Sequence, residues 1–158
     1  QVGTLVVVYF FDLAEKRKSG WKYKNFYLLE ETEDNELLAL SFKGTKENAA
    51  GVSLYLSSFL SKNGIEESRA NRIAVAVEEM AANCAERMEG KKKFADIDIR
   101  IFADKKETII SVRDNGDEFD PLNDDKEFEM SPLTVVKAIS DKVEYSRALG
   151  FNRTIIKL

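Results

Sequence analysis

From residue 37 onward, hydrophobic and polar positions follow the periods of strands and helices. Helical spacing covers 45–63, where Thr45 is a suitable N-cap, and 66–89, and a third helix is expected to begin at Ser131-Pro132. Short strands are expected at 38–42, 97–101, 108–113, 142–146 and 154–158. This order of elements predicts an α/β two-layer sandwich, with helices on one face of a mixed, mainly antiparallel sheet.

The first residues of the chain have a different character. Residues 2–13 (VGTLVVVYFFDL) are apolar except at two positions, and the basic cluster 16–18 follows. Twelve residues are too few to cross a bilayer as a helix, which takes about 20. Two interpretations remain open: the last turns of a transmembrane helix with the basic cluster at its cytoplasmic end, or a strand or amphipathic helix packed on the domain. The acidic run 30–36 is the expected boundary, which divides the chain into an N-terminal segment, 1–34, and a folded domain, 35–158.

Composition narrows the chemistry that these 158 residues can perform. With 44% hydrophobic and 33% charged residues and a net charge of −4, the chain has no basic stripe, so we expect no nucleic-acid partner. The absence of histidine excludes a histidine triad, histidine metal ligands and phosphohistidine within this sequence. Cys84, the one cysteine, excludes an internal disulfide and fits a reducing compartment. We expect Cys84 to be a small packing residue.

The helical run around Glu79 and Asn83 contains the most informative spacing. The two residues are four positions apart, so on a helix they share one face and can direct a carboxylate and an amide oxygen to one point. Magnesium prefers such oxygen ligands, and a nearby carboxylate can orient or deprotonate an attacking group. The alternative, for this pair alone, is a solvated helix face with no role in binding.

Three motifs in order resemble the histidine-kinase-like ATPase fold, also called the GHKL or Bergerat fold. They lie in the stretches AVAVEEMAANCAER, ISVRDNGDEFDPL and VVKAISDKVEYSRALGFNRTIIKL, and the resemblance covers Leu37 to Leu158. Within the fold, the pattern is most similar to the anti-sigma-factor serine kinases. The resemblance implies a domain that binds ATP or ADP together with Mg²⁺.

The resemblance also implies a role for each matching residue. Asn83 corresponds to the asparagine that holds magnesium against the phosphates, and Glu79 to the carboxylate that acts as general base or orients the nucleophile. Asp114 corresponds to the aspartate that accepts a hydrogen bond from the adenine amino group, and Gly116 to the glycine that lets the backbone approach the base. Thr154 matches the hydroxyl residue beside adenine.

Two departures from the family pattern are present, and the second weakens the expected phosphate site. Glu118 stands where the second glycine of Asp-x-Gly-x-Gly is common, and Met130-Ser131-Pro132 replaces the glycine-rich turn before the last helix. Proline has no N–H to donate to a phosphate. We expect the acidic stretch 123–129 to be mobile without ligand. Two functions therefore remain open: an ATP-binding regulatory domain that phosphorylates a protein serine or threonine, or a degenerate pseudo-ATPase that binds another protein.

A second resemblance concerns the order of segments. An apolar segment, a basic cluster and an aromatic stretch ahead of such a domain resemble the cytoplasmic tails of bacterial membrane proteins related to MATE-type transporters. The two resemblances together imply a cytoplasmic location, membrane attachment through the N-terminal side, a homodimer, and a protein partner similar to a sigma factor or to an anti-sigma antagonist.

Overall fold

The computed structural model describes residues 36–103, 106–122 and 132–158. Their elements, in chain order, are β1 (Glu36–Lys43), α2 (Lys46–Lys62), α3 (Glu67–Arg87), β2 (Asp96–Ala103), β3 (Thr108–Asp114), α4 (Pro132–Ile139), β4 (Lys142–Ala148) and β5 (Phe151–Lys157). The strands form one sheet in the order β1-β2-β3-β5-β4, and every pairing among these strands is antiparallel. The predicted two-layer α/β architecture is confirmed.

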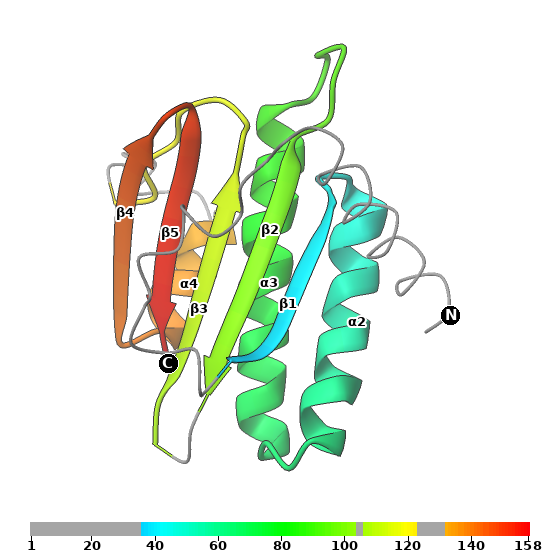
Figure 1. Cartoon of the computed structure of the whole chain (residues 1–158), viewed down its shortest axis with the longest axis vertical. Coiled ribbons are helices and arrows are strands. Elements are labelled where there is room, and N and C mark those ends of the chain that lie inside the picture. Colours follow the sequence, from blue (N-terminus) through cyan, green and yellow to red (C-terminus); the bar gives the residue numbers. More distant parts are fainter. Residues whose placement is uncertain (1–35, 104–105, 123–131) are drawn as a thin grey trace.

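The three helices lie on one face of the sheet, which Figure 1 shows from the opposite side. Alternation along β2 explains this arrangement, because Ile97, Ile99 and Ile101 all point toward the helices and are fully buried. From α3, Ile73 and Val77 pack into the same core. The core therefore holds α3 firmly against the middle of the sheet.

Local signals set the ends of the two long helices as the sequence predicts. Thr45 caps α2, and its hydroxyl oxygen accepts a hydrogen bond from the Asn48 N–H at 3.1 Å. Helix α3 is capped in the same way by Glu66, and its 21 residues give it a length of about 30 Å. The helix thus extends the full length of the strands and brings its last turns beside the end of β3.

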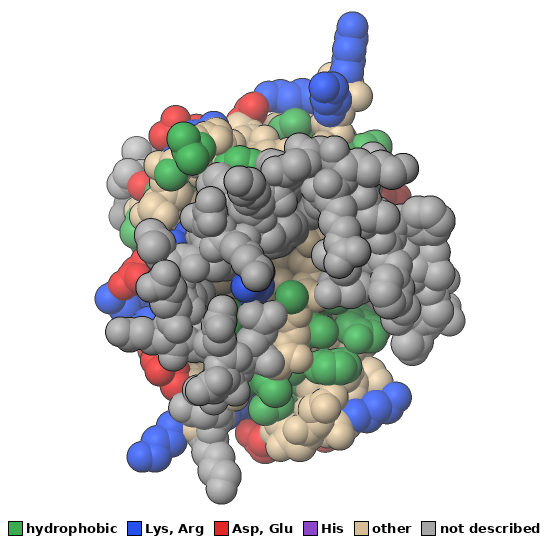
Figure 2. Space-filling view, in the orientation of Figure 1, with side chains coloured by type: hydrophobic (Ala, Val, Ile, Leu, Met, Phe, Trp, Pro, Cys, Tyr) green, Lys and Arg blue, Asp and Glu red, His purple; other side chains and the backbone are tan. Residues whose placement is uncertain are grey.

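The sheet face turned away from the helices has a buried polar cluster of its own. Asp98 accepts hydrogen bonds from the Ser41 hydroxyl at 2.6 Å and from Arg113 Nη2 at 2.6 Å, across three neighbouring strands. The guanidinium of Arg113 also lies over the Phe151 ring, 4.9 Å from its centroid. Figure 2 views this side of the molecule, where basic and acidic side chains of the described residues are scattered around the margin.

A two-residue turn joins β4 to β5. Leu149 and Gly150 both have positive φ angles, 52° and 80°, as a primed hairpin turn requires. The turn pairs Ala148 with Phe151 and Arg147 with Asn152. It therefore decides which residues of β5 face the helices.

Several predictions fall on residues that the structure does not describe. They concern the apolar segment 2–13, the boundary near 34, the mobile stretch 123–129 and the start of α4 at Ser131. Within the described ranges, no helix combines the length and the apolar character needed to cross a membrane.

Candidate functional site

The predicted site residues lie where the C-terminal half of α3 passes the end of β3. Asp114 is the last residue of β3, and Asn152 lies directly opposite it on β5. On α3, Glu79, Asn83 and Arg87 follow one another at intervals of four residues and so share one helix face. The fold brings Asn83 and Asp114 together through Arg87, which contacts both.

Asp114 is a buried carboxylate, 4% exposed, whose oxygens are well supplied with donors. Its Oδ1 accepts from the Gly116 N–H and from Asn152 Nδ2, both at 2.9 Å. Its Oδ2 accepts from Arg87 Nη2 at 3.1 Å. These charge-assisted bonds fix the position of the carboxylate.

Gly116 lies so close to Asp114 that a side chain would not fit. A Cβ atom added there would be 2.9 Å from Asp114 Oδ1 and 3.4 Å from Arg87 Nη1. The neighbouring carboxylate would have to shift, and with it the bond from the Gly116 N–H. The role of Gly116 beside a base stays a prediction.

Arg87 connects the two predicted binding groups. Its Nε donates to Asn83 Oδ1 at 2.9 Å, while Nη2 holds Asp114. Its Nη1 donates to the Asp117 carbonyl at 2.6 Å, and the guanidinium lies over the Phe119 ring, 4.9 Å from the centroid. One cation therefore joins the predicted magnesium ligand, the predicted base acceptor and the loop after β3.

Asn152 is a second residue that sequence analysis did not single out. Besides Asp114, its Nδ2 donates to the Asp117 carbonyl at 2.7 Å. Its Oδ1 accepts from the Tyr145 hydroxyl and from Arg147 Nη1, both at 2.8 Å. This buried amide uses its donors and its acceptor to hold β3, β4, β5 and the loop in place.

Cys84 is buried in the core, as predicted, and it also supports the site. Burial is the main cause that raises the pKa of its thiol to about 12, and the negative charge of Asp114 adds to the effect while Arg87 opposes it. The thiol is therefore neutral at physiological pH and hydrogen-bonds to Asp114. We conclude that Cys84 acts as a donor and a packing group.

Thr154 and Glu79 lie at the edges of this arrangement. Thr154 is buried on β5, two positions beyond Asn152 on the same face, and pairs with Val112 of β3. Glu79 is partly exposed on α3, one turn before Asn83. Their predicted roles beside the base and at the reacting hydroxyl stay predictions.

Glu79 carries a raised pKa that gives a stability prediction. Partial burial raises it above the usual 4.5, and the negative charges of Glu78 and Glu86 add to the shift. The folded domain then binds this proton more tightly than the unfolded chain, so stability falls as the pH rises through the raised pKa. Glu79→Gln, which cannot ionise, is expected to be more stable than wild type at pH 7, by at most about 1 kcal/mol.

Urea denaturation across pH tests this expectation. The stability difference between Glu79→Gln and wild type should vanish well below pH 4.5, where Glu79 is neutral in both states. Glu89→Gln, at an exposed position just beyond α3, controls for the loss of one negative charge. A Glu79→Gln protein less stable than wild type at neutral pH would contradict the raised pKa of Glu79.

The described residues contain no group of three acidic, cysteine or histidine side chains that could hold a metal ion by themselves. A magnesium ion here would rest on the Asn83 oxygen and on oxygens of a ligand and water, which is its usual manner of binding beside phosphates. The acceptors present, an amide oxygen and a buried carboxylate, fit a magnesium ion and an amino group respectively. Arg87 occupies both acceptors in this structure.

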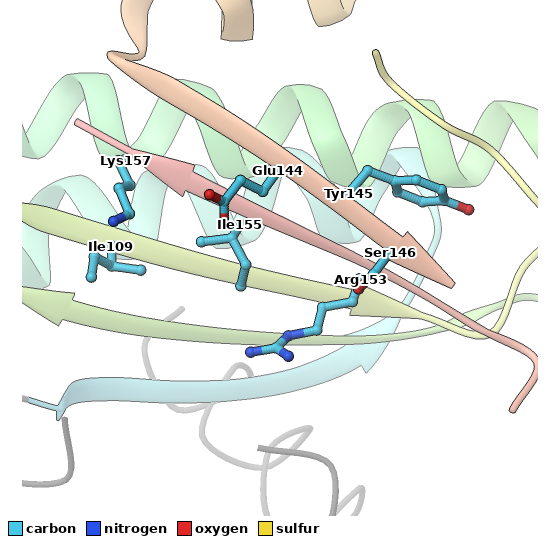
Figure 3. A pocket seen from close by; sticks show the side chains of 7 residues that line it. All are labelled: Ile109, Glu144, Tyr145, Ser146, Arg153, Ile155 and Lys157. Carbon is cyan, nitrogen blue, oxygen red and sulfur yellow. The ribbon is translucent and has the colours of Figure 1, made fainter. Parts of the chain in front are cut away.

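A hollow of about 450 Å³ lies elsewhere, on the sheet face turned away from the helices (Figure 3). Strands β3, β4 and β5 line it with Ile109, Glu144, Tyr145, Ser146, Arg153, Ile155 and Lys157. It contains none of the residues predicted to bind nucleotide. The site at Asp114 is therefore separate from this hollow.

The fold and the site together define an α/β domain with a buried carboxylate and a close-fitting glycine at the end of a central strand. A family model agrees: the chain belongs to the histidine kinase-like ATPase domain family, whose model matches residues 42–158. No curated protein is similar enough to match. The resemblance inferred from the three motifs is confirmed at the level of this family.

Proposed function

We propose that this domain binds ATP or ADP with Mg²⁺ between α3 and the end of β3, and that it has a regulatory role. The observation that carries the proposal is the buried Asp114 carboxylate beside Gly116, where a side chain would not fit. A buried carboxylate of this kind favours a base that carries an amino group, because such a base can donate a hydrogen bond to it. Membership of the ATPase domain family supports the same ligand.

In this proposal each residue has a limited task. Asp114 holds the base, Gly116 gives the backbone room beside it, Thr154 lies near the base, and Asn83 supplies an oxygen to the magnesium ion. The bound nucleotide supplies the phosphoryl group. Glu79 accepts or orients the proton of an attacking hydroxyl, and its raised pKa suits a proton acceptor.

The finer proposal is a protein serine/threonine kinase of the anti-sigma-factor type. It acts on a partner similar to an anti-sigma antagonist or binds one similar to a sigma factor. The domain would work as a homodimer on the cytoplasmic side of a membrane, attached through its N-terminal side. The motif order in α3, β3 and the last two strands supports this type.

A second candidate, a pseudo-ATPase that binds a protein partner, also has a specific observation in its favour. Arg87 already holds both Asn83 and Asp114, so the domain satisfies these groups without a nucleotide. Two departures from the family pattern point the same way: Glu118 replaces a common glycine, and Pro132 lies in the turn that otherwise donates N–H groups to phosphate.

Calorimetric titration with ATP and ADP, with and without Mg²⁺, separates the two candidates. We expect wild type to bind in a magnesium-dependent manner, and Asn83→Ala to lose at least about tenfold in affinity, which is roughly 1.4 kcal/mol. Asn71→Ala, an exposed asparagine earlier on the same helix, is the matched control and should bind as wild type does. Absence of heat at millimolar nucleotide from a folded protein would favour the pseudo-ATPase.

A further inference from the structure

Arg87 occupies the two acceptors that the proposed ligand needs. Its guanidinium holds Asn83 Oδ1 through Nε at 2.9 Å and Asp114 Oδ2 through Nη2 at 3.1 Å. We propose that Arg87 is an internal competitor of the nucleotide, which closes the empty site and must leave before magnesium and the base can bind. This inference rests on the proposed function, whose regulation it describes.

The donors around Asp114 differ in how readily they can leave. Gly116 donates from the backbone, Asn152 is a buried amide with several partners, and Cys84 is a buried thiol. Arg87 reaches Asp114 with a long side chain that is still 13% exposed. Of these four donors, Arg87 is the one that can rotate toward solvent without breaking the core.

The Asn83 side of the site leads to the same conclusion. An oxygen that accepts a hydrogen bond from a guanidinium at 2.9 Å cannot take a magnesium ion in the same place, since the two cations would repel each other at contact distance. Magnesium would replace Arg87 as the cation beside Asn83, and the phosphates of the nucleotide would offset its higher charge. The amino group of the base would replace Arg87 as a hydrogen-bond donor to Asp114.

Release of Arg87 would also reach the loop after β3. Arg87 Nη1 donates to the Asp117 carbonyl at 2.6 Å, and the guanidinium covers the Phe119 ring. Asn152 would still accept from the Phe119 N–H at 3.3 Å and donate to the Asp117 carbonyl at 2.7 Å, while the Phe119 ring would lose its cation. Nucleotide binding is therefore coupled to the conformation of this loop at Phe119.

Titration of Arg87→Met with magnesium-ATP tests the proposal, because methionine keeps the packing on Phe119 and removes the cation. If the site is open one tenth of the time or less in wild type, removing the competitor raises the affinity about tenfold or more. The ring proton chemical shifts of Phe119, which no longer lies under a cation, should move in nucleotide-free Arg87→Met toward those of nucleotide-bound wild type. Arg72→Met, an exposed arginine of the same helix, is the matched control and should change neither reading.

The outcomes separate this inference from the proposed function. Wild type that binds nucleotide, with Arg87→Met binding equally or more weakly, would reject the competitor and leave the function intact. No binding by either folded protein would reject both. Should Arg87→Met fail to fold, Arg87→Lys is tested in its place. One ammonium cannot hold Asn83, Asp114 and Asp117 together, so we expect a smaller gain in affinity from this variant.

Discussion

Asp114→Ala is expected to abolish nucleotide binding and to lower the free energy of unfolding by roughly 2–4 kcal/mol. The loss of stability has a clear cause: the Gly116 N–H and Asn152 Nδ2, both buried, would lose their common acceptor. Arg87 would also lose its ion-pair partner, but it adds less to the loss because its side chain can turn toward solvent. Binding would fail because the acceptor for the base is gone.

Urea denaturation and calorimetric titration of the same variant test both parts. Asp141→Ala, at an exposed aspartate before β4, controls for the loss of one negative charge and should leave both quantities within about 0.5 kcal/mol of wild type. An Asp114→Ala protein that unfolds at the wild-type urea concentration would show that the bonds to Asp114 are not maintained in solution. Binding of ATP by that variant would place the base elsewhere.

Asp98→Ala is expected to have the largest effect on stability, roughly 3–5 kcal/mol. Asp98 and Arg113 are 2% and 3% exposed, and alanine would leave the Arg113 guanidinium buried without this partner. The Ser41 hydroxyl would lose its acceptor as well. Because the cluster lies on the face away from Asp114, the folded fraction should bind nucleotide with wild-type affinity.

The comparison with Asp96→Ala makes this prediction specific to burial. Asp96 belongs to the same strand and face as Asp98 and pairs with Lys43, whose side chain is 46% exposed. Removal of such a pair is expected to cost less than about 1 kcal/mol in denaturation experiments. Equal losses of unfolding free energy in the two variants would contradict the importance of burial. Weakened nucleotide binding by folded Asp98→Ala would show that the polar cluster and the site at Asp114 are not independent.

Much of the fold could be predicted from the sequence because it depends on local signals. Alternating isoleucines predict β2, and Thr45 with the spacing of apolar residues predicts α2. The shared face of Glu79 and Asn83 follows from helical geometry in the same way. These features need only a few neighbouring residues, and the structure has them where the patterns indicate.

The contacts of the site were harder to predict, since they join distant parts of the chain. Asn152 is 38 residues from Asp114, and only the sheet register puts them opposite each other. Arg87 was visible as the next position on the face of Glu79 and Asn83, yet an arginine in the last turn of a helix usually faces solvent. Its inward direction depends on the acceptors that β3 and the following loop present.

The turn at Leu149 and Gly150 makes the site sensitive to the number of residues between β4 and β5. Leu149 is 84% exposed, so the identity of its side chain matters little beyond the positive φ angle. A single inserted residue that shifted the β5 pairing by one position would turn Asn152 and Thr154 to the opposite face of the sheet and bring Arg153 to the helices. The residue types of this turn can therefore vary. A change of its length by one residue would remove Asn152 from the site at Asp114, although the turn itself makes no contact there.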